Sequence, residues 1–117
     1  MHVHFYLFTV PSPVVEVASI YTVEFGETTT LECNVTAVRG ITSRVDIIWI
    51  TGYNHTIVRR IEDVEPYILG NSAVYIDTLV TSPLNINDNG RFYNCAVTIN
   101  STFGVSSYAI IVLHLTG

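Results

Sequence analysis

Apolar residues in this chain fall into nine short runs separated by turn residues, and no stretch shows helical periodicity. β-Branched and aromatic residues fill the runs, and glycine and asparagine mark the intervals, as in Gly26-Glu27 and Asp88-Asn-Gly90. This pattern is typical of strands connected by turns and predicts an all-β fold. The predicted strands are Val14–Ala18, Ile20–Val23, Thr28–Thr36, Arg44–Thr51, His55–Ile61, Pro66–Leu69, Val74–Thr81, Arg91–Asn100 and Tyr108–Leu115.

The chain has the length and composition of one folded domain. Of its 117 residues, 49% are hydrophobic and 13% are charged, which is too apolar for a disordered segment. No internal repeat or low-complexity segment divides it. We therefore expect one domain over residues 14–117. Residues 1–13 are expected to be a leader remnant, a flexible N-terminal segment, or an edge strand that ends at Pro11 and Pro13.

The charge balance argues against two classes of partner. Ten acidic residues stand against five arginines, no lysine is present, and the formal net charge is -5. Such a chain offers no basic patch for the phosphates of a nucleic acid or for an anionic membrane. Its apolar stretches are also far shorter than the roughly 20 residues that cross a bilayer. We expect no nucleic-acid or membrane contact, and we expect any anchor to lie elsewhere in a parent chain.

Glycosylation motifs and cysteines together indicate an extracellular protein. The acceptor pattern N-x-[ST] occurs three times, at Asn34, Asn54 and Asn100, and we predict a glycan on each. The two cysteines, Cys33 and Cys95, form neither a CxxC pair nor a cluster with histidine, which argues against a zinc site. An even cysteine count beside three acceptor motifs favours a secreted protein or the ectodomain of a cell-surface protein.

Side chains that could support catalysis are scattered along the chain. The four histidines are His2, His4, His55 and His114. No serine, aspartate or cysteine stands with any of them in a nucleophile pattern, and the carboxylates of Asp63 and Glu65 suit a solvated loop. We expect no enzymatic activity, no cofactor and no bound metal.

A set of residues around the two cysteines follows a fixed spacing. In Gly26-Glu-Thr-Thr-Thr-Leu-Glu-Cys33, a turn glycine precedes the cysteine by seven residues and Leu31 precedes it by two. Trp49 lies in the next apolar run, and Tyr93 stands two residues before Cys95. The set is completed by Leu79, Leu84, Asp88 and Gly90. In this order the chain resembles the immunoglobulin superfamily over about 100 residues.

The resemblance implies an immunoglobulin-like, two-sheet antiparallel β-sandwich with one inter-sheet disulfide. Cys33 and Cys95 then pair, and Trp49 packs on the bridge. Tyr93 is buried, with its hydroxyl hydrogen-bonded to backbone at the preceding corner. The long segment after Trp49 leaves room for an additional strand on the front sheet, which indicates the intermediate or variable-like set.

Three departures from the family pattern carry expectations of their own. The segment Asp88-Asn-Gly-Arg-Phe-Tyr-Asn-Cys95 has one residue more than the family pattern, which predicts a bulge. No arginine stands near Pro66–Leu69 to pair with Asp88. Counting back from Leu79 in steps of two turns Asp77 inward, and this leaves the register of that strand open.

Alternation also predicts where a partner binds. If Trp49, Cys95 and Ile111 face the core, their neighbours form the outer face of the front sheet. An apolar outer face on an antiparallel sheet indicates a covered surface. The predicted partner-binding residues are Ile48, Ile50, Ala96, Thr98, Tyr108, Ile110 and Val112. The alternative is that a loop, a neighbouring domain or the N-terminal segment covers this face.

Three functions agree with these observations. The first is an adhesion module that binds a protein partner, either a copy of itself as a homodimer through the front sheet or a similar domain. The second is the ligand-binding ectodomain of a signalling receptor, such as a receptor tyrosine kinase. The third is a structural spacer between other domains. The fold alone does not choose among them.

Overall fold

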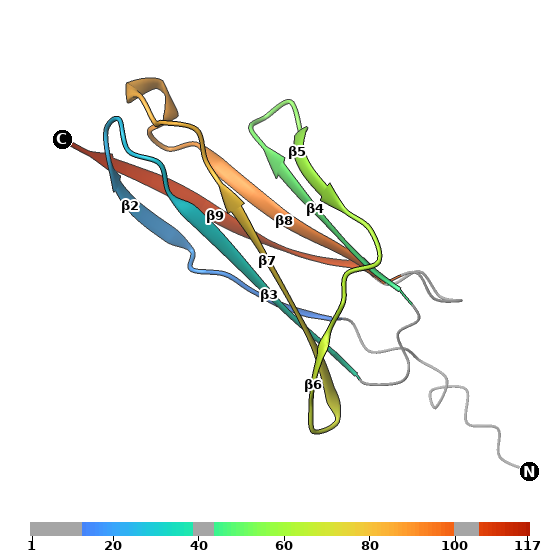
Figure 1. Ribbon diagram of the computed structural model, residues 1–117. Coiled ribbons are helices and arrows are strands. Elements are labelled where there is room, and N and C mark those ends of the chain that lie inside the picture. Colours follow the sequence, from blue (N-terminus) through green and yellow to red (C-terminus); the bar gives the residue numbers. More distant parts are fainter. Residues whose placement is uncertain (1–12, 39–43, 100–105) are drawn as a thin grey trace, which may run out of the picture.

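The computed structural model describes residues 13–38, 44–99 and 106–117 and shows a sandwich of two β-sheets (Figure 1). Its strands are β1 (Val14–Glu16), β2 (Ile20–Glu24), β3 (Thr30–Val38), β4 (Val45–Thr51), β5 (Thr56–Ile61), β6 (Tyr67–Leu69), β7 (Ser72–Val80), β8 (Phe92–Ile99) and β9 (Ser106–Thr116). The back sheet has the order β1-β3-β7-β6, and the front sheet has the order β2-β9-β8-β4-β5. Each of the nine predicted strands is present, with ends shifted by one or two residues in most of them.

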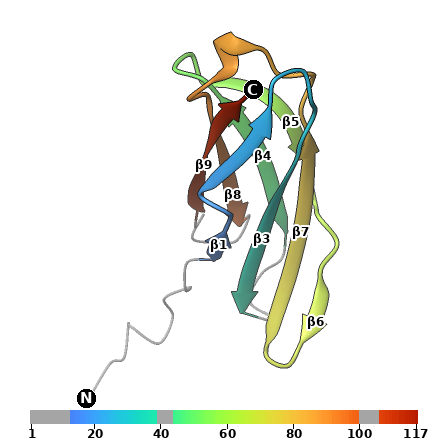
Figure 2. The same cartoon turned by 90° about the vertical axis from the view of Figure 1, so that its left-hand side faces the viewer.

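The first two strands belong to different sheets (Figure 2). β1 pairs antiparallel with β3 in the back sheet, and β2 pairs with β9 in the front sheet. The chain keeps its direction as it crosses between the sheets, so β2 runs parallel to β9, with Ile20 beside Val112. The prediction of a wholly antiparallel sandwich is therefore wrong at this one edge.

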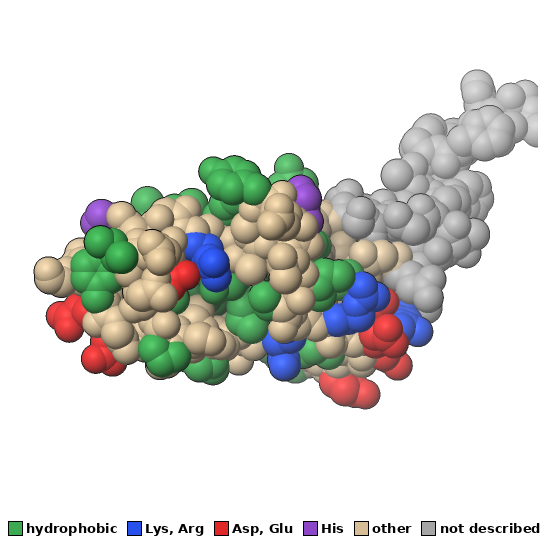
Figure 3. Space-filling view, turned by 90° about the horizontal axis from the view of Figure 1, so that it is seen from above, with side chains coloured by type: hydrophobic (Ala, Val, Ile, Leu, Met, Phe, Trp, Pro, Cys, Tyr) green, Lys and Arg blue, Asp and Glu red, His purple; other side chains and the backbone are tan. Residues whose placement is uncertain are grey.

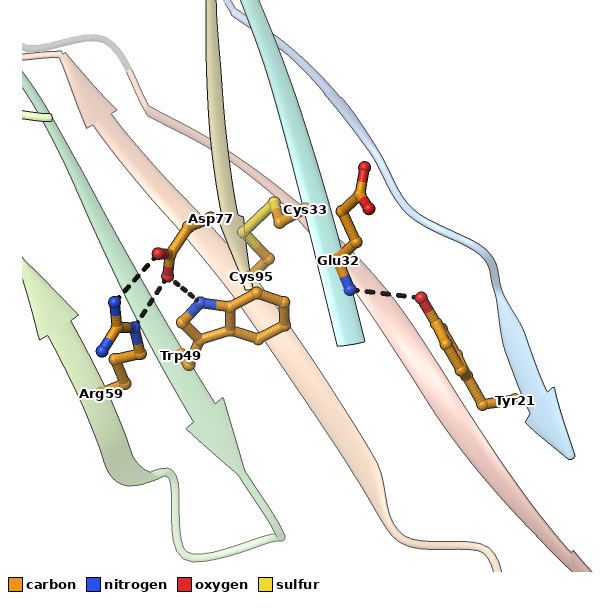
Figure 4. Close-up of a disulfide and its surroundings, with 7 residues drawn as sticks. All are labelled: Tyr21, Glu32, Cys33, Trp49, Arg59, Asp77 and Cys95. Atoms are coloured by element: carbon orange, nitrogen blue, oxygen red, sulfur yellow. Dashed lines mark hydrogen bonds and ion pairs between the residues drawn. A yellow bond between two sulfur atoms is a disulfide. The ribbon is translucent and has the colours of Figure 1, made fainter. Parts of the chain in front are cut away.

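The core lies between the sheets and surrounds a disulfide. Cys33 on β3 is bonded to Cys95 on β8, as the resemblance implies. Trp49 is fully buried beside the bridge and pairs with Cys95 across β4 and β8 (Figure 4). The bridge spans 62 positions of sequence. By the loop-entropy model, closing a loop of this length stabilises the fold by about 4 kcal/mol.

A buried carboxylate also links the two sheets (Figure 4). Asp77 on β7 is 7% exposed and accepts a hydrogen bond from Trp49 Nε1 at 2.7 Å. It also accepts two from Arg59, whose Nε and Nη2 lie at 3.0 and 3.1 Å. Trp49 and Arg59 belong to the front sheet, so these bonds satisfy the indole N–H and compensate the carboxylate across the sandwich. The count that turned Asp77 inward is therefore correct.

A short 3₁₀ turn, η2 (Ile86–Asp88), precedes the segment that carries the added residue. Asn85 caps this turn, because its side chain accepts the N–H of Asn87 at 2.9 Å. In return, the Asp88 carboxylate accepts the N–H of Asn85 at 2.9 Å. The added residue lies between Gly90 and Tyr93. There Gly90 donates its N–H to the Leu113 carbonyl, and Leu113 donates its N–H to the Arg91 carbonyl, both at 2.9 Å. Two residues thus oppose one, and Gly90 has a φ of +80°, so the predicted bulge is confirmed.

Two side chains at this corner, those of Asp88 and Tyr93, differ from the family pattern. Asp88 pairs with Arg91 in its own turn, at 3.4 Å between Nε and Oδ1, and needs no arginine near β6. Tyr93 is buried at 6% exposure. Within the described chain its hydroxyl makes no hydrogen bond, so the predicted bond to the corner backbone is wrong. Tyr93 instead lines an open hollow with Thr51 and Leu79, where water can reach it.

Candidate functional site

The outer face of the front sheet collects apolar side chains from all five strands. On β4 every second residue is buried, so Ile47 and Trp49 point inward while Ile48 and Ile50 lie half-buried outside. The same alternation runs along β8 and β9. The charged Asp46 and Arg60 also point outward and border this apolar region. We define the front face as the outward residues inside that border: Ile20, Ile48, Ile50, Ile57, Phe92, Asn94, Ala96, Thr98, Tyr108, Ile110 and Val112.

Strand register arranges the front face in rows that cross the sheet. One row consists of Ile110, Asn94, Ile50 and Ile57, on β9, β8, β4 and β5. The next row consists of Tyr108, Ala96, Ile48 and Arg60, on β9, β8, β4 and β5. Tyr108 is 67% exposed and Ile110 is 47% exposed, so no described residue covers this part of the face. Apart from Asn94 and Arg60, the side chains of these two adjoining rows are apolar, so they form a patch and not a set of isolated side chains.

All seven residues predicted to bind a partner lie on the front face, although their role in binding remains a prediction. Sequence reasoning missed Ile20, Ile57, Phe92 and Asn94. Because Cys95 and Tyr93 face inward, strand alternation could have predicted that Asn94 and Phe92 point outward. Ile20 and Ile57 depend on pairings of edge strands that no local pattern specified.

Asn94 occupies the middle of the front face, and its amide oxygen is not satisfied. Oδ1 is buried and accepts no hydrogen bond in the described chain. The residues beside it on neighbouring strands are Ile50 and Ile110, whose side chains have no donor. An unpaired buried acceptor costs about 1–3 kcal/mol. The chain therefore keeps a polar group at the centre of an apolar surface in spite of this cost.

Charged side chains lie at the border of the front face. Arg44 Nε lies 2.9 Å from Asp46 Oδ1, and Arg44 Nη2 lies 3.1 Å from Glu62. Burial alone would raise the pKa of Asp46, but hydrogen bonds from the Asp63 N–H and the Arg44 guanidinium lower it below its ordinary value. Figure 3 shows acidic and basic side chains gathered toward one end of the molecule, next to the grey segment.

The three predicted glycosylation sites lie in different settings. Asn34 is half-buried on β3 and lines a shallow hollow on the back sheet with Glu16 and Tyr21. Asn54 is exposed in the turn between β4 and β5. Asn100 lies outside the described residues. No sugar is shown at any of them, so glycosylation remains a prediction.

Among residues 13–38, 44–99 and 106–117, no three or more histidine, cysteine, aspartate or glutamate side chains are grouped to hold a metal ion. His55 and His114 are both exposed, and His2 and His4 lie outside the described residues. The same part of the chain contains no helix long and apolar enough to cross a membrane.

The sequence matches no protein-family model and no curated protein. The structure is similar to that of murine CRIg, with a TM-score of 0.59 and 15% identity over 92% of this chain and 100% of that one. The fold is immunoglobulin-like. A second similar structure is the CARDB domain of a Pyrococcus furiosus protein, solved in complex with di-metal ions. It has a TM-score of 0.55 and 16% identity over 93% of this immunoglobulin-like chain and 98% of that domain.

Proposed function

We propose that this immunoglobulin-like domain is an extracellular recognition module that binds a protein partner through its front face and acts in cell adhesion. The observation that carries the proposal is the row of outward apolar side chains around Tyr108 and Ile110. In an antiparallel sheet with one face in water, that face is normally polar. A contiguous apolar surface on a folded domain marks an interaction site.

The size and shape of the front face suit a protein partner. Outward residues on neighbouring strands stand about 4.8 Å apart, and along a strand they repeat about every 6.8 Å. The eleven positions of the front face therefore cover on the order of 350 Å² of flat sheet. Side-chain relief raises the accessible area, and a standard interface buries about 800 Å² on each partner. A flat apolar face of this extent fits another flat protein surface better than it fits a small molecule.

The composition of the front face supports specific recognition and not non-specific hydrophobic association. Tyr108 supplies an exposed aromatic anchor of the kind that interfaces favour. Asn94 places a half-buried amide at the centre of the face, a polar group in an otherwise apolar contact. The disulfide and the exposed acceptor asparagine Asn54 support the extracellular setting.

Two narrower features belong to the same proposal. The split of the N-terminal segment between β1 and β2, together with β5 on the front sheet, supports the intermediate or variable-like set. The second candidate function, a ligand-binding receptor ectodomain, uses the same face with a different partner. Analytical ultracentrifugation separates the two in part, because dimers that depend on concentration favour homophilic adhesion.

The test compares two double variants with matched exposure. Tyr108→Ser/Ile110→Ser removes side chains that are 67% and 47% exposed on the front face. Ile76→Ser/Val80→Ser removes side chains that are 45% and 65% exposed on β7 of the back sheet. Beads carrying each protein are mixed with one another and with cells of the natural host.

The front-face variant is expected to lose bead–bead or bead–cell adhesion at least a hundredfold, because each interface anchor contributes about 2 kcal/mol. The back-sheet variant should adhere like the parent chain. Both should keep their melting temperature within a few degrees. Equal adhesion by the two variants, or no adhesion by the parent chain, would contradict the proposal.

A further inference from the structure

An open hollow of about 500 Å³ lies at one end of the sandwich, outside the front face apart from Phe92. One wall is the turn between β4 and β5, which carries Tyr53 and Asn54. The other wall is formed by η2 and the start of β8, with Asn87, Asn89 and Arg91. Gly52 donates its N–H to the Phe92 carbonyl at 3.4 Å, and Thr51 Oγ1 donates to the same carbonyl at 2.9 Å. The two walls are therefore joined without a ligand.

An aromatic ring stands exposed in this hollow. Tyr53 is 90% exposed, and its ring meets Phe92 edge-on, with centroids 5.3 Å apart and planes at 79°. Because Tyr53 is 90% exposed, the contact with Phe92 leaves at least one face of its ring open. An exposed aromatic face suits a flat ligand with C–H groups, because the ring carries partial negative charge on its faces.

The polar groups around the ring are neutral amides. Three of the lining residues are Asn54, Asn87 and Asn89. Asn89 Oδ1 accepts the N–H of Leu115 at 3.0 Å, which fixes the orientation of its amide and leaves its –NH₂ without a partner in the described chain. Arg91 is already paired with Asp88, and no acidic residue lines the hollow. Neutral amide donors and acceptors, of which Asn89 is held in place, suit hydroxyl groups better than they suit an ion.

We infer that this hollow is a carbohydrate-binding site. A sugar ring lies with its C–H face on Tyr53 and exchanges hydrogen bonds between its hydroxyls and the amides of Asn54, Asn87 and Asn89. The sugar has two sources of the same chemistry. It is either the first part of the chain's own glycan, because Asn54 is an acceptor asparagine in the wall of the hollow, or a glycan carried by another molecule. The inference stands apart from the proposed front-face function.

The first arm of the experiment tests the chain's own glycan. The protein is produced in a glycosylating host as the parent chain and as Thr56→Ala, which removes the acceptor motif, with Thr56→Ser as the variant that keeps it. Mass spectrometry establishes occupancy at Asn54. NMR amide shifts are then compared between the glycosylated and unglycosylated proteins, at Tyr53, Phe92, Asn87 and Asn89.

The second arm tests a glycan from another molecule. Unglycosylated protein is titrated with N-acetylglucosamine, methyl mannoside and galactose, and the same amides are followed. Tyr53→Ala is expected to weaken binding at least tenfold, and Tyr108→Ala is the control because it removes another exposed tyrosine, on the front face. Loss of adhesion in the front-face variants has no bearing on this result, so the two proposals fail independently.

A positive result in either arm identifies the source of the bound sugar. Shifts at the hollow that depend on the Asn54 glycan and disappear with Tyr53→Ala assign the site to the chain's own sugar. Shifts produced by a free sugar in the unglycosylated chain, lost with Tyr53→Ala and kept with Tyr108→Ala, assign it to an external glycan. Hollow residues that respond in neither arm, or that respond equally with Tyr53→Ala, would overturn the inference.

Discussion

The two outer faces of the sandwich are built by the same alternation but have different chemistry. The back sheet turns Glu16, Glu32, Asn34 and Thr78 outward, beside the exposed apolar side chains of Ile76 and Val80. The front face has no carboxylate in its rows between Phe92 and Ala96. Folding requires only that the inward residues be apolar, and both sheets meet this requirement. The carboxylates on the back sheet alone are therefore not needed for the fold, and under the proposed function the front face is the surface that binds a partner.

The contrast between the two outer faces depends on the register of β7, which turns Asp77 inward and Thr78 outward. The largest loss of stability is therefore expected from Asp77→Ala. Removing the carboxylate leaves the buried Trp49 indole N–H unpaired and Arg59 without its counter-charge. We expect a loss of about 3 kcal/mol in the free energy of unfolding, the range found for breaking a buried pair. Urea unfolding measures it. Thr78→Val, one residue away and outward, should change stability by less than about 0.5 kcal/mol, and equal losses in the two variants would contradict the role given to Asp77.

A single charge should distinguish the two outer faces. Ile110→Glu places a carboxylate on the front face, where association would have to desolvate it, and Thr78→Glu places one on the back sheet. We expect Ile110→Glu to weaken association about a hundredfold, which corresponds to about 2.7 kcal/mol, and Thr78→Glu to leave it unchanged. Sedimentation or bead adhesion measures both. Weakening by both variants to the same extent would point to net charge and not to the face.

Asn94 and Asn34 offer a closer comparison, because each stands next to one cysteine of the disulfide and points out of its own sheet. Asn94→Val removes the buried oxygen that has no donor, so we expect the domain to gain about 1 kcal/mol. Asn34→Val should be nearly neutral in unglycosylated protein, because Asn34 lines an open hollow. Thermal and urea unfolding provide the values. A loss of stability in Asn94→Val would show that its oxygen has a partner in solution.

The smallest change in stability is expected when low pH protonates Asp46 at the border of the front face. Because the folded-state pKa of Asp46 is lowered, its contribution to stability is complete above the ordinary aspartate pKa of about 3.9 and is lost as the pH falls below it. An NMR titration should place the Asp46 midpoint below that value. Asp46→Asn should reduce the loss of stability between pH 5 and the acid limit of about pH 2. A midpoint at or above the ordinary value would refute the assignment.

Residues tied to the disulfide were the most predictable part of the fold. Leu31, Trp49 and Tyr93 stand at fixed distances from Cys33 and Cys95, and strand alternation then turns their neighbours outward. This reasoning was sufficient to place the seven predicted residues of the front face on one surface. They share a surface because side chains alternate along a strand, and this alternation can be counted in the sequence.

What remained unpredicted depends on contacts between distant segments. The parallel pairing of β2 with β9 needs the path of the chain between the sheets, and no local pattern records it. The Arg59–Asp77 pair joins β5 to β7, so parity could turn Asp77 inward but could not name its counter-charge. The bulge before Cys95 was predictable from the added residue, but the cap that Asn85 and Asp88 form on η2 was not. The hollow at Tyr53 joins two turns that are far apart in the sequence.

The parallel pairing of β2 and β9 also affects how the domain responds to tension. These strands lie toward opposite ends of the chain, and they run side by side from Ile20–Val112 to Glu24–Thr116. A force that separates the two ends pulls β2 backward along its axis and β9 forward. The hydrogen bonds between them are then loaded together in shear, whereas antiparallel neighbours pulled from one end would open one bond at a time. A module that holds cells together would carry such a force along its strands.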